Sequence, residues 1–340
     1  MLTGHGDDTY LYKDIRINFS SNIYPHADLT ALEQHLCRNI DCIRSYPEPS
    51  PRSLEAMIAR KYGIEAEEVM VTSGATDAIY LIAQAMRRLK TYHVVHPTFS
   101  EYDDACRMFG YEEKEASAYL CWLCNPNNPT GRVATEDSLL NLSQQFELMV
   151  VDQSYEDYTL LHLPQPDEML RHGNIVQIHS MTKQYAIPGL RLGYITGPSS
   201  IIQHLRQHGR PWAVNTLAIE AGKWLVAGSE KLIADIQSYI DETQRLRNRL
   251  NTIEGITALP TQTTFFLCTI QGATAAELKD YLATKHGILI RDASNFRSLS
   301  PHHFRIATQT PAENDALVDA ISQFIQQRQY IKQRQLIQQR

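Results

Sequence analysis

Hydrophobic residues in the first two thirds of the chain alternate between short apolar runs and longer segments with helical spacing. Segments such as 75–86 place apolar residues three and four positions apart, which predicts helices. Strands that alternate with helices form a mostly parallel sheet with helices on both faces. We therefore predict an α/β domain over residues 27–220. The apolar runs that predict its strands are 69–73, 92–97, 119–124, 148–152 and 175–179.

The pattern changes near residue 220, where long helical segments mix with short isolated strands. Helices are predicted at 231–250 and 275–285, and a strand at 265–268. This mixture predicts a smaller α+β domain, formed by residues 1–26 and 221–323. In 324–340 the apolar residues do not collect on one helical face, so we expect a polar, solvated C-terminal tail.

Composition is that of a globular protein, with 43% hydrophobic and 21% charged residues. A formal net charge of −6 does not favour nucleic-acid binding, which leaves a basic footprint. The chain has no apolar run of about 18 residues and no signal-peptide pattern at its start, so neither a membrane nor secretion is expected. Cys121 and Cys124 form C-x-x-C within an apolar run, and no second pair lies at finger spacing. We expect a cytoplasmic protein without a metal site.

Polar or aromatic residues follow each predicted strand at its carboxyl end. Gly74 lies between a strand and a helix, and this arrangement forms an anion site suited to one phosphate. Phe99 follows the next strand and could stack on a planar ligand. Asn128 lies in an amide-rich turn, and Asp152 ends an apolar strand, where a carboxylate needs a cation such as a protonated pyridine nitrogen. Because ligands bind at the carboxyl ends of strands in open α/β sheets, these positions predict one site.

Lys183 follows the fifth strand and has hydroxyl residues on both sides. A lysine near anion-binding groups can form a Schiff base with an aldehyde. A surface lysine would be the usual interpretation of Lys183 alone, but the preceding strand ends supply a site for an aldehyde cofactor.

Two further features could bind ligands or a partner. Arg291 and Arg305 lie in or directly after predicted strands, which suits a phosphate or carboxylate; surface ion pairs are the alternative. Tyr46 lies in a loop with three prolines, which either reaches a neighbouring subunit or is a plain linker.

Three motifs together resemble the fold-type I pyridoxal-phosphate enzymes of the class I/II aminotransferase superfamily. They are Ser180-x-Thr182-Lys183 with Gly189-Leu190-Arg191-Leu192-Gly193-Tyr194, Asn125-Pro126-Asn127-Asn128-Pro129-Thr130-Gly131, and Asp152-x-x-Tyr155. The resemblance covers residues 4 to 323 and implies an aspartate-aminotransferase-like fold, the cofactor pyridoxal 5′-phosphate (PLP) and a homodimer with shared active sites.

The resemblance also implies individual roles. Lys183 would form the Schiff base, Asp152 would pair with the pyridine nitrogen, and Tyr155 with Asn128 would contact the 3-oxygen. Phe99 would stack on the ring, and Tyr46 would reach the phosphate of the partner's cofactor. The substrate would be bound by Arg291, Arg305, Ser21, Asn22 and His5. Residues expected around the cofactor phosphate are Gly74, Ala75, Thr76, Ser180, Thr182 and Arg191.

Two branches of the superfamily are similar to this chain: the threonine-phosphate decarboxylases of cobalamin biosynthesis and the histidinol-phosphate aminotransferases. Phe19-Ser20-Ser21-Asn22-Ile23, Pro211-Trp212-Ala213-Val214-Asn215 and 288–296 fit the first branch better. Asp7-Asp8 in place of Gly-Asn and Tyr155 where that branch can carry Phe are departures. We expect decarboxylation of L-threonine O-3-phosphate, with transamination using 2-oxoglutarate as the alternative and a non-catalytic PLP-fold protein as a remote one.

Overall fold

The computed structural model describes residues 6–24, 26–228 and 235–338, which form two compact units. Unit 2 contains Tyr24–Asn127 and Val133–Ala234. Unit 1 contains the chain up to Ile23, the segment Asn128–Arg132 and the chain from Asp235 onward. The short segment with Asn128 therefore belongs to unit 1, although the strands on either side of it belong to unit 2.

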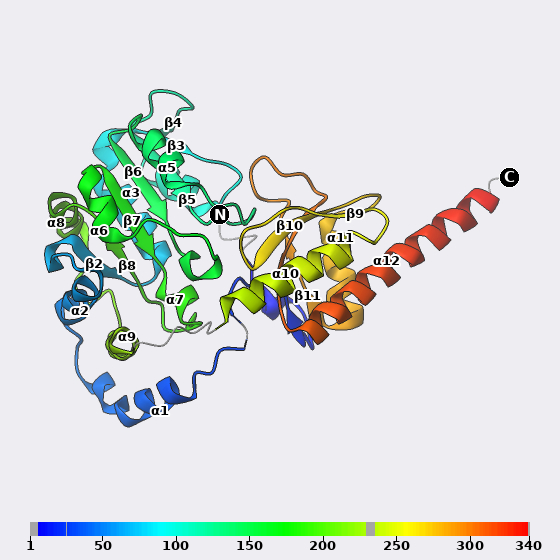
Figure 1. Cartoon of the computed structure of the whole chain (residues 1–340), viewed down its shortest axis with the longest axis horizontal. Helices are drawn as coiled ribbons and strands as arrows, with labels where there is room; N and C mark the ends of the chain where they lie inside the picture. The colour runs from blue at the N-terminus through cyan, green and yellow to red at the C-terminus, as the bar shows by residue number, and fades with distance from the viewer. Residues whose placement is uncertain (1–5, 25, 229–234, 339–340) are drawn as a thin grey trace. The chain divides into compact units, whose positions relative to one another are not determined.

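Unit 2 is built on a seven-stranded sheet with the order β2-β8-β7-β6-β5-β3-β4 (Figure 1). Pairing is parallel from β7 to β4, whereas β8 runs antiparallel to both of its neighbours. The central strands are buried along their whole length, which explains their continuous apolar sequences. The strands are β2 Val69–Thr72, β3 Thr91–Val94, β4 Glu112–Glu113, β5 Leu120–Cys124, β6 Leu148–Asp152, β7 Ile175–His179 and β8 Gly193–Thr196.

Helices cover both faces of this sheet, as predicted. Alternate residues of β5 face opposite sides: Cys121 packs with Leu139 of α5, whereas Trp122 stacks on Tyr102 of α4. Near β2 and β8, Leu54 of α2 joins one apolar cluster with residues of α9. The helices of unit 2 are α1 Thr30–Arg38, α2 Arg52–Tyr62, α3 Ala75–Ala85, α4 Glu101–Met108, α5 Glu136–Ser143, α6 Pro166–Met169, α7 Met181–Gln184, α8 Ser199–His208 and α9 Thr216–Ala227.

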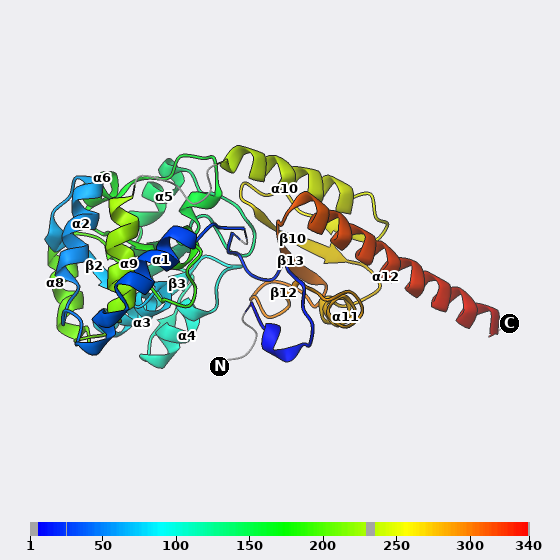
Figure 2. The same ribbon diagram turned by 90° about the horizontal axis from the view of Figure 1, so that it is seen from below.

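Unit 1 has a four-stranded antiparallel sheet, β12-β13-β10-β9, and a two-stranded parallel sheet, β1-β11. Helices α10 and α12 lie side by side, and their apolar residues Leu246 and Leu317 share one core with Phe266 of β10 (Figure 2). The elements are β1 Ile17–Asn18, β9 Ile256–Ala258, β10 Phe265–Ile270, β11 Ile288–Leu289, β12 Arg291–Asp292, β13 His303–Ala307, α10 Ile236–Leu250, α11 Ala275–Tyr281 and α12 Pro311–Gln338.

Helix α12 is longer than the sequence pattern predicts. The segment beyond residue 323 continues as helix to Gln338 and extends away from β10 and β13 in both views (Figures 1 and 2). Gln, Arg, Lys and Leu have high helix propensity, so a helix can continue there without an apolar face. Tyr330 and Ile331 are exposed, in agreement with the expected solvated surface.

Within the described ranges, no helix has both the length and the apolar character needed to cross a membrane.

Candidate active site

The carboxyl ends of β5, β6 and β7 meet at one edge of the unit 2 sheet. Asp152, the last residue of β6, has Cys124 and Ile178 as its neighbours on the adjacent strands. Strand β7 ends at His179 and leads through Ser180 into α7, which carries Lys183. The strand ends that carry Asp152 and lead to Lys183 are therefore adjacent in the sheet.

The Asp152 carboxylate is buried and firmly held, with 4% of the residue exposed. Its Oδ2 accepts a hydrogen bond of 2.7 Å from the Tyr102 hydroxyl, and its Oδ1 accepts one of 2.9 Å from the Ser154 backbone N–H. Burial raises the pKa of Asp152, and the hydrogen bonds from Ser154 and Tyr102 act in the opposite direction. A cation placed against this carboxylate would stabilise its ionised form, so a pyridinium nitrogen fits the group.

Gly74 and Arg191 form a cradle at the N-terminus of α3. Gly74 has φ +86°, and a Cβ added there would lie 2.8 Å from Nη2 of Arg191, so the guanidinium lies directly against the glycine backbone. Gly193 also lies close to this turn, because a Cβ there would be 3.0 Å from the Ala75 nitrogen. A guanidinium beside the start of an eleven-residue helix is suited to a phosphate. The structure thus brings Gly74, Ala75 and Arg191 together.

The segment around Lys183 is fixed by its backbone. The Tyr158 hydroxyl donates to the Lys183 carbonyl oxygen at 2.9 Å, and the Lys183 N–H donates to the Ser180 oxygen at 3.1 Å. Tyr155 is buried and meets Tyr158 edge-on, with ring centroids 6.1 Å apart. Tyr158 was not predicted from the sequence, although its position three residues after Tyr155 would have been a signal.

Three other predicted cofactor residues of unit 2 differ in their surroundings. Thr182 is buried, and its Oγ1 donates to the Leu192 carbonyl oxygen at 3.4 Å. Ser180 is also buried and precedes α7 as its N-cap residue. Phe99 meets the Tyr102 ring edge-on, with centroids 5.9 Å apart and planes at 85°. Phe99 is therefore linked through Tyr102 to Asp152.

Arg291 and Arg305 are opposite each other across the antiparallel pair β12–β13 in unit 1. Both are buried, at 6% and 4% exposed. Arg305 donates to the Ser20 carbonyl oxygen at 2.5 Å and to Oδ1 of Asn128. Burial lowers the pKa of Arg291, which donates to Oδ1 of Asn295 at 2.8 Å. Asn128 is thus placed beside a predicted substrate residue within unit 1.

The remaining predicted substrate residues lie near the start of the chain. Asn22 is buried, and its Nδ2 and Oδ1 have no hydrogen-bond partner among the residues that the structure describes. Two buried amide atoms in this state suit a polar ligand, because an unpaired buried polar group is costly. Ser21 is half-buried, and His5 lies outside the described residues.

Tyr46 is 85% exposed and packs on Trp212, which is 49% exposed, with ring centroids 5.4 Å apart. The Trp212 backbone N–H donates to the Pro49 carbonyl oxygen at 3.0 Å, so a hydrogen bond joins the two loops. An exposed aromatic pair is typical of an interaction surface. The pairing of Tyr46 with Trp212 was not predicted from the sequence.

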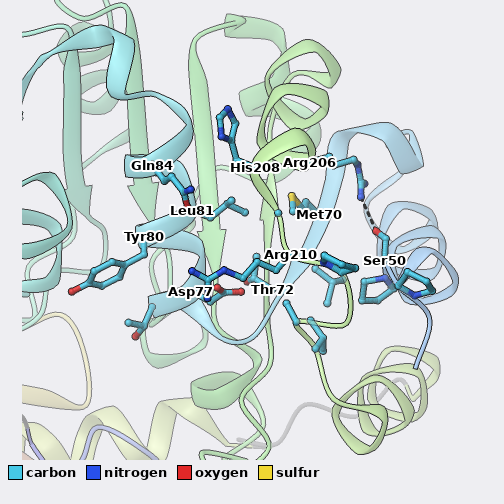
Figure 3. Close-up of a pocket in the computed structure, with 18 of the residues that line it drawn as sticks. Ser50, Met70, Thr72, Asp77, Tyr80, Leu81, Gln84, Arg206, His208 and Arg210 are labelled. Carbon is cyan, nitrogen blue, oxygen red and sulfur yellow. Dashed lines mark hydrogen bonds between the residues drawn. The ribbon is translucent and has the colours of Figure 1, made fainter. Parts of the chain in front are cut away.

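A cavity of about 610 Å³ opens beside these loops in unit 2 (Figure 3). It is lined by residues of α3 and of the loop after α8, including Asp77, Tyr80 and Arg210. Arg206 crosses one side and donates to the Ser50 hydroxyl at 3.2 Å (Figure 3). Among its lining residues, Thr76 is a predicted cofactor residue, so the cavity borders the start of the phosphate cradle.

One cluster in unit 2 has side chains of the types that bind metal ions. His96 Nε2 lies 3.5 Å from Oδ2 of Asp103 and 3.9 Å from Oε1 of Glu113. One histidine beside two carboxylates also fits an ion-pair cluster, so this geometry does not require a metal.

Comparison with known proteins is consistent with this geometry. The family model for aminotransferase class I and II matches residues 14–119 and 110–321. A protein of Caldanaerobacter subterraneus, provisionally named a threonine-phosphate decarboxylase, is 32% identical over 93% of this chain and 92% of its own. A histidinol-phosphate aminotransferase of the same organism is 27% identical over 86% of this chain and 90% of its own.

The fold is also that of a solved structure. The crystal structure of L-threonine-O-3-phosphate decarboxylase from Porphyromonas gingivalis is 38% identical, with a TM-score of 0.88, and the match covers 92% of this chain and all of that one. The predicted fold and enzyme class are therefore confirmed, and with the class its cofactor, PLP. The chain belongs to the aminotransferase class I and II family.

Proposed function

We propose that this chain decarboxylates L-threonine O-3-phosphate to the phosphate ester of 1-aminopropan-2-ol. The main support is the similarity to the P. gingivalis decarboxylase, at 38% identity over 92% of the chain. In the reaction the bond between Cα and the carboxylate carbon breaks, CO2 leaves without the bonding electron pair, and a proton is added to Cα. Bound PLP supplies the electron sink for that pair.

Residues of unit 2 hold the cofactor in this proposal. The Asp152 carboxylate, which already accepts two hydrogen bonds, would face the positive charge of the pyridine nitrogen. Arg191 and the backbone at Gly74 would bind the phosphate, since the guanidinium lies against that turn. Lys183 would hold the cofactor at its aldehyde carbon, and its Nζ would supply the proton that Cα receives. Tyr155 would contact the 3-oxygen.

Arg291 and Arg305 bind the substrate phosphate. A phosphate dianion suits two guanidinium groups on directly opposite residues of neighbouring strands. The acceptors described for them are neutral oxygens of Ser20, Asn128, Asp292 and Asn295, which orient the guanidinium groups. With the phosphate held by these arginines, the substrate carboxylate would not be bound by them and could leave as CO2.

Transamination is the second candidate, favoured by the 27% identity to a histidinol-phosphate aminotransferase. The same residues would serve it if Arg305 bound the substrate carboxylate instead, because the carboxylate would then be retained and the Cα–H bond would break. A single assay separates the two reactions. Purified enzyme with PLP, phosphothreonine and 2-oxoglutarate should release CO2 and form no oxo acid from phosphothreonine; formation of that oxo acid without CO2 would refute decarboxylation.

A matched pair of variants tests the role of Arg291. Arg291→Lys keeps the charge but loses the planar donor pair, so kcat/KM for phosphothreonine should fall about 100-fold. Arg245→Lys is the control in the same unit, because Arg245 is partly exposed and pairs with Glu242 and Asp315. Equal activity of both variants would contradict the assignment of Arg291.

We also infer a homodimer in which Tyr46 completes the partner's site. The exposed aromatic pair Tyr46–Trp212 supports this, since exposed aromatic residues are enriched at interfaces. Light scattering should give twice the chain mass, and Tyr46→Ala should weaken PLP binding. A monomeric wild-type protein with full PLP affinity would argue against it. We further infer a cytoplasmic location, which is supported by six cysteines that form no disulfide bond.

A further inference from the structure

Tyr102 contacts two residues of the cofactor site and has no assigned role. It lies in the first turn of α4, is 1% exposed, and donates its hydroxyl hydrogen to Oδ2 of Asp152 at 2.7 Å. The two residues are 50 positions apart in sequence, so this contact exists only in the folded protein. A buried side chain that contacts the pyridine-binding carboxylate can change how that carboxylate meets a ligand.

The Tyr102 ring is held on two sides. It stacks on Trp122, with centroids 5.3 Å apart and planes at 14°, and it meets Phe99 edge-on at 5.9 Å. Trp122 is itself anchored, because its Nε1 donates to Sγ of Cys106 at 3.2 Å. Aromatic pairs in these geometries are favourable. The direction of the Tyr102 hydroxyl is therefore set by packing and does not depend on the carboxylate alone.

The hydroxyl is a donor throughout the working pH range. Burial, and next the charge of Asp152, raises the pKa of Tyr102 well above its usual value. The phenol therefore stays protonated and donates toward the carboxylate. Oδ1 of Asp152 accepts a hydrogen bond from the Ser154 backbone N–H, so the protein supplies one donor to each carboxylate oxygen.

We propose that Tyr102 is a positioning residue for PLP, which orients the Asp152 carboxylate to face the pyridine nitrogen. This rests on the proposed role of Asp152 in cofactor binding. Two lone-pair directions of the carboxylate are occupied by donors from the protein, so the carboxylate cannot rotate freely. A carboxylate that loses a donor is protonated more easily, and a neutral carboxyl attracts a cation less.

Tyr102→Phe removes this hydroxyl and keeps the ring. We expect the dissociation constant of PLP for the apoprotein to rise about tenfold, since a hydrogen bond to a charged group is lost. On the acid side, PLP affinity falls as the pH is lowered; we call this the acid limb. In Tyr102→Phe the acid limb should move to higher pH, because the Asp152 carboxyl then protonates more readily. If the ring had a purely structural role, the acid limb would not move.

The matched control is Tyr92→Phe in the same unit. Tyr92 is also 1% exposed, and its hydroxyl donates to a different buried carboxylate, Oδ1 of Asp103, at 3.0 Å. Both variants lose one buried phenol–carboxylate hydrogen bond, so they should lose similar stability. We expect only Tyr102→Phe to change PLP affinity and its pH limb.

The experiment titrates apoprotein with PLP between pH 5 and 8.5, followed by visible absorbance and tryptophan fluorescence. Wild-type affinity and an unchanged acid limb for Tyr102→Phe would overturn the proposal, as would equal losses in both variants. A double-mutant cycle adds a second check. Tyr102→Phe should have little further effect in an Asp152→Asn background, and a full additional tenfold loss there would also overturn the proposal.

No substrate is used, so failure of the decarboxylase assignment leaves this result unaffected. A wild-type protein that decarboxylates nothing, together with a tenfold loss of PLP affinity in Tyr102→Phe, would support Tyr102 and refute the substrate. Active wild-type enzyme, together with an unchanged PLP affinity in Tyr102→Phe, would support the substrate and refute the role of Tyr102.

Discussion

The guanidinium of Arg191 lies against the backbone of Gly74, so closely that a Cβ at residue 74 would be 2.8 Å from Nη2. Gly74 also has φ +86°, a conformation that residues with a side chain rarely adopt. Gly74→Ala should therefore displace Arg191 and weaken PLP binding about tenfold or more. Equilibrium titration of the apoprotein with PLP measures this.

Gly63→Ala is the control for Gly74→Ala, because it separates backbone strain from the displaced arginine. Gly63 ends α2 with φ +66°, and no atom lies within 4 Å of the added Cβ. Both substitutions should cost about 1 kcal/mol of folding free energy or more through strain. If Gly63→Ala weakened PLP binding as much as Gly74→Ala, the cradle would not explain the effect.

Gly6 offers a way to test the substrate arginines without replacing them. A Cβ at this position would lie 2.8 Å from the Ser20 carbonyl oxygen and 3.5 Å from Nη2 of Arg305. Gly6→Ala should shift this segment and raise the KM for phosphothreonine about tenfold, while PLP affinity stays unchanged. Gly228→Ala, whose Cβ would meet its nearest atom at 3.5 Å, should behave as wild type in the same steady-state assay. A loss of PLP affinity in Gly6→Ala would count against a substrate-specific effect.

Asp152 should make the apoprotein sensitive to pH. Burial raises its pKa, so the folded protein binds this proton more tightly than the unfolded chain does. The stabilisation that this proton gives is fully present below the pKa of the carboxyl in the unfolded chain, about 3.9. It is lost as the pH rises through the pKa of Asp152 in the folded protein. Asp152→Asn should remove this loss while weakening PLP binding about 100-fold.

Thermal unfolding of the two apoproteins at pH 4 and pH 8 measures this. Wild type should lose more stability than Asp152→Asn between these pH values. A smaller loss of stability in wild type than in Asp152→Asn would show that the carboxylate is stabilised by its surroundings even without a bound cation.

Glu55 should be important for the stability of unit 2. The residue is 0% exposed, and its oxygens lie 3.0 and 2.9 Å from Nη1 and Nη2 of Arg206. Its Oε1 also accepts the Val71 N–H at 3.1 Å. Because breaking a buried pair leaves an uncompensated charge, Glu55→Gln should cost about 3 kcal/mol in denaturant unfolding.

Glu277→Gln is the matched control for Glu55→Gln. Glu277 pairs with Arg328 at 3.2 Å, and both side chains are exposed. Removal of this surface pair should cost less than about 1 kcal/mol. A similar cost for both variants would mean that burial does not set the strength of the Glu55 pair.

Local features of the sequence were sufficient to single out several candidate site residues. Asp152 ends an apolar run, and Gly74 separates a strand from a helix, so each could be recognised from its neighbours in sequence. The helical extension to Gln338 could not, because Gln and Arg favour a helix without producing an amphipathic pattern.

Other relationships depend on strand register and on contacts between distant segments. Arg291 lies opposite Arg305 through a register that the sequence does not encode in any short motif. Tyr46 meets Trp212 because two loops more than 160 positions apart share a backbone hydrogen bond from Trp212 to Pro49. Such pairs cannot be inferred from local spacing.

The sequence by itself determined the α/β sheet, the order of its strands along the chain and the strand-end positions of Asp152 and Lys183, because periodicity and turn residues are local properties. Only the tertiary structure decided which groups surround those positions. Tyr102 reaches Asp152 across 50 residues because α4 packs onto the sheet, and Arg191 lies against Gly74 because β8 pairs with β2. Both contacts join side chains that no local pattern connects.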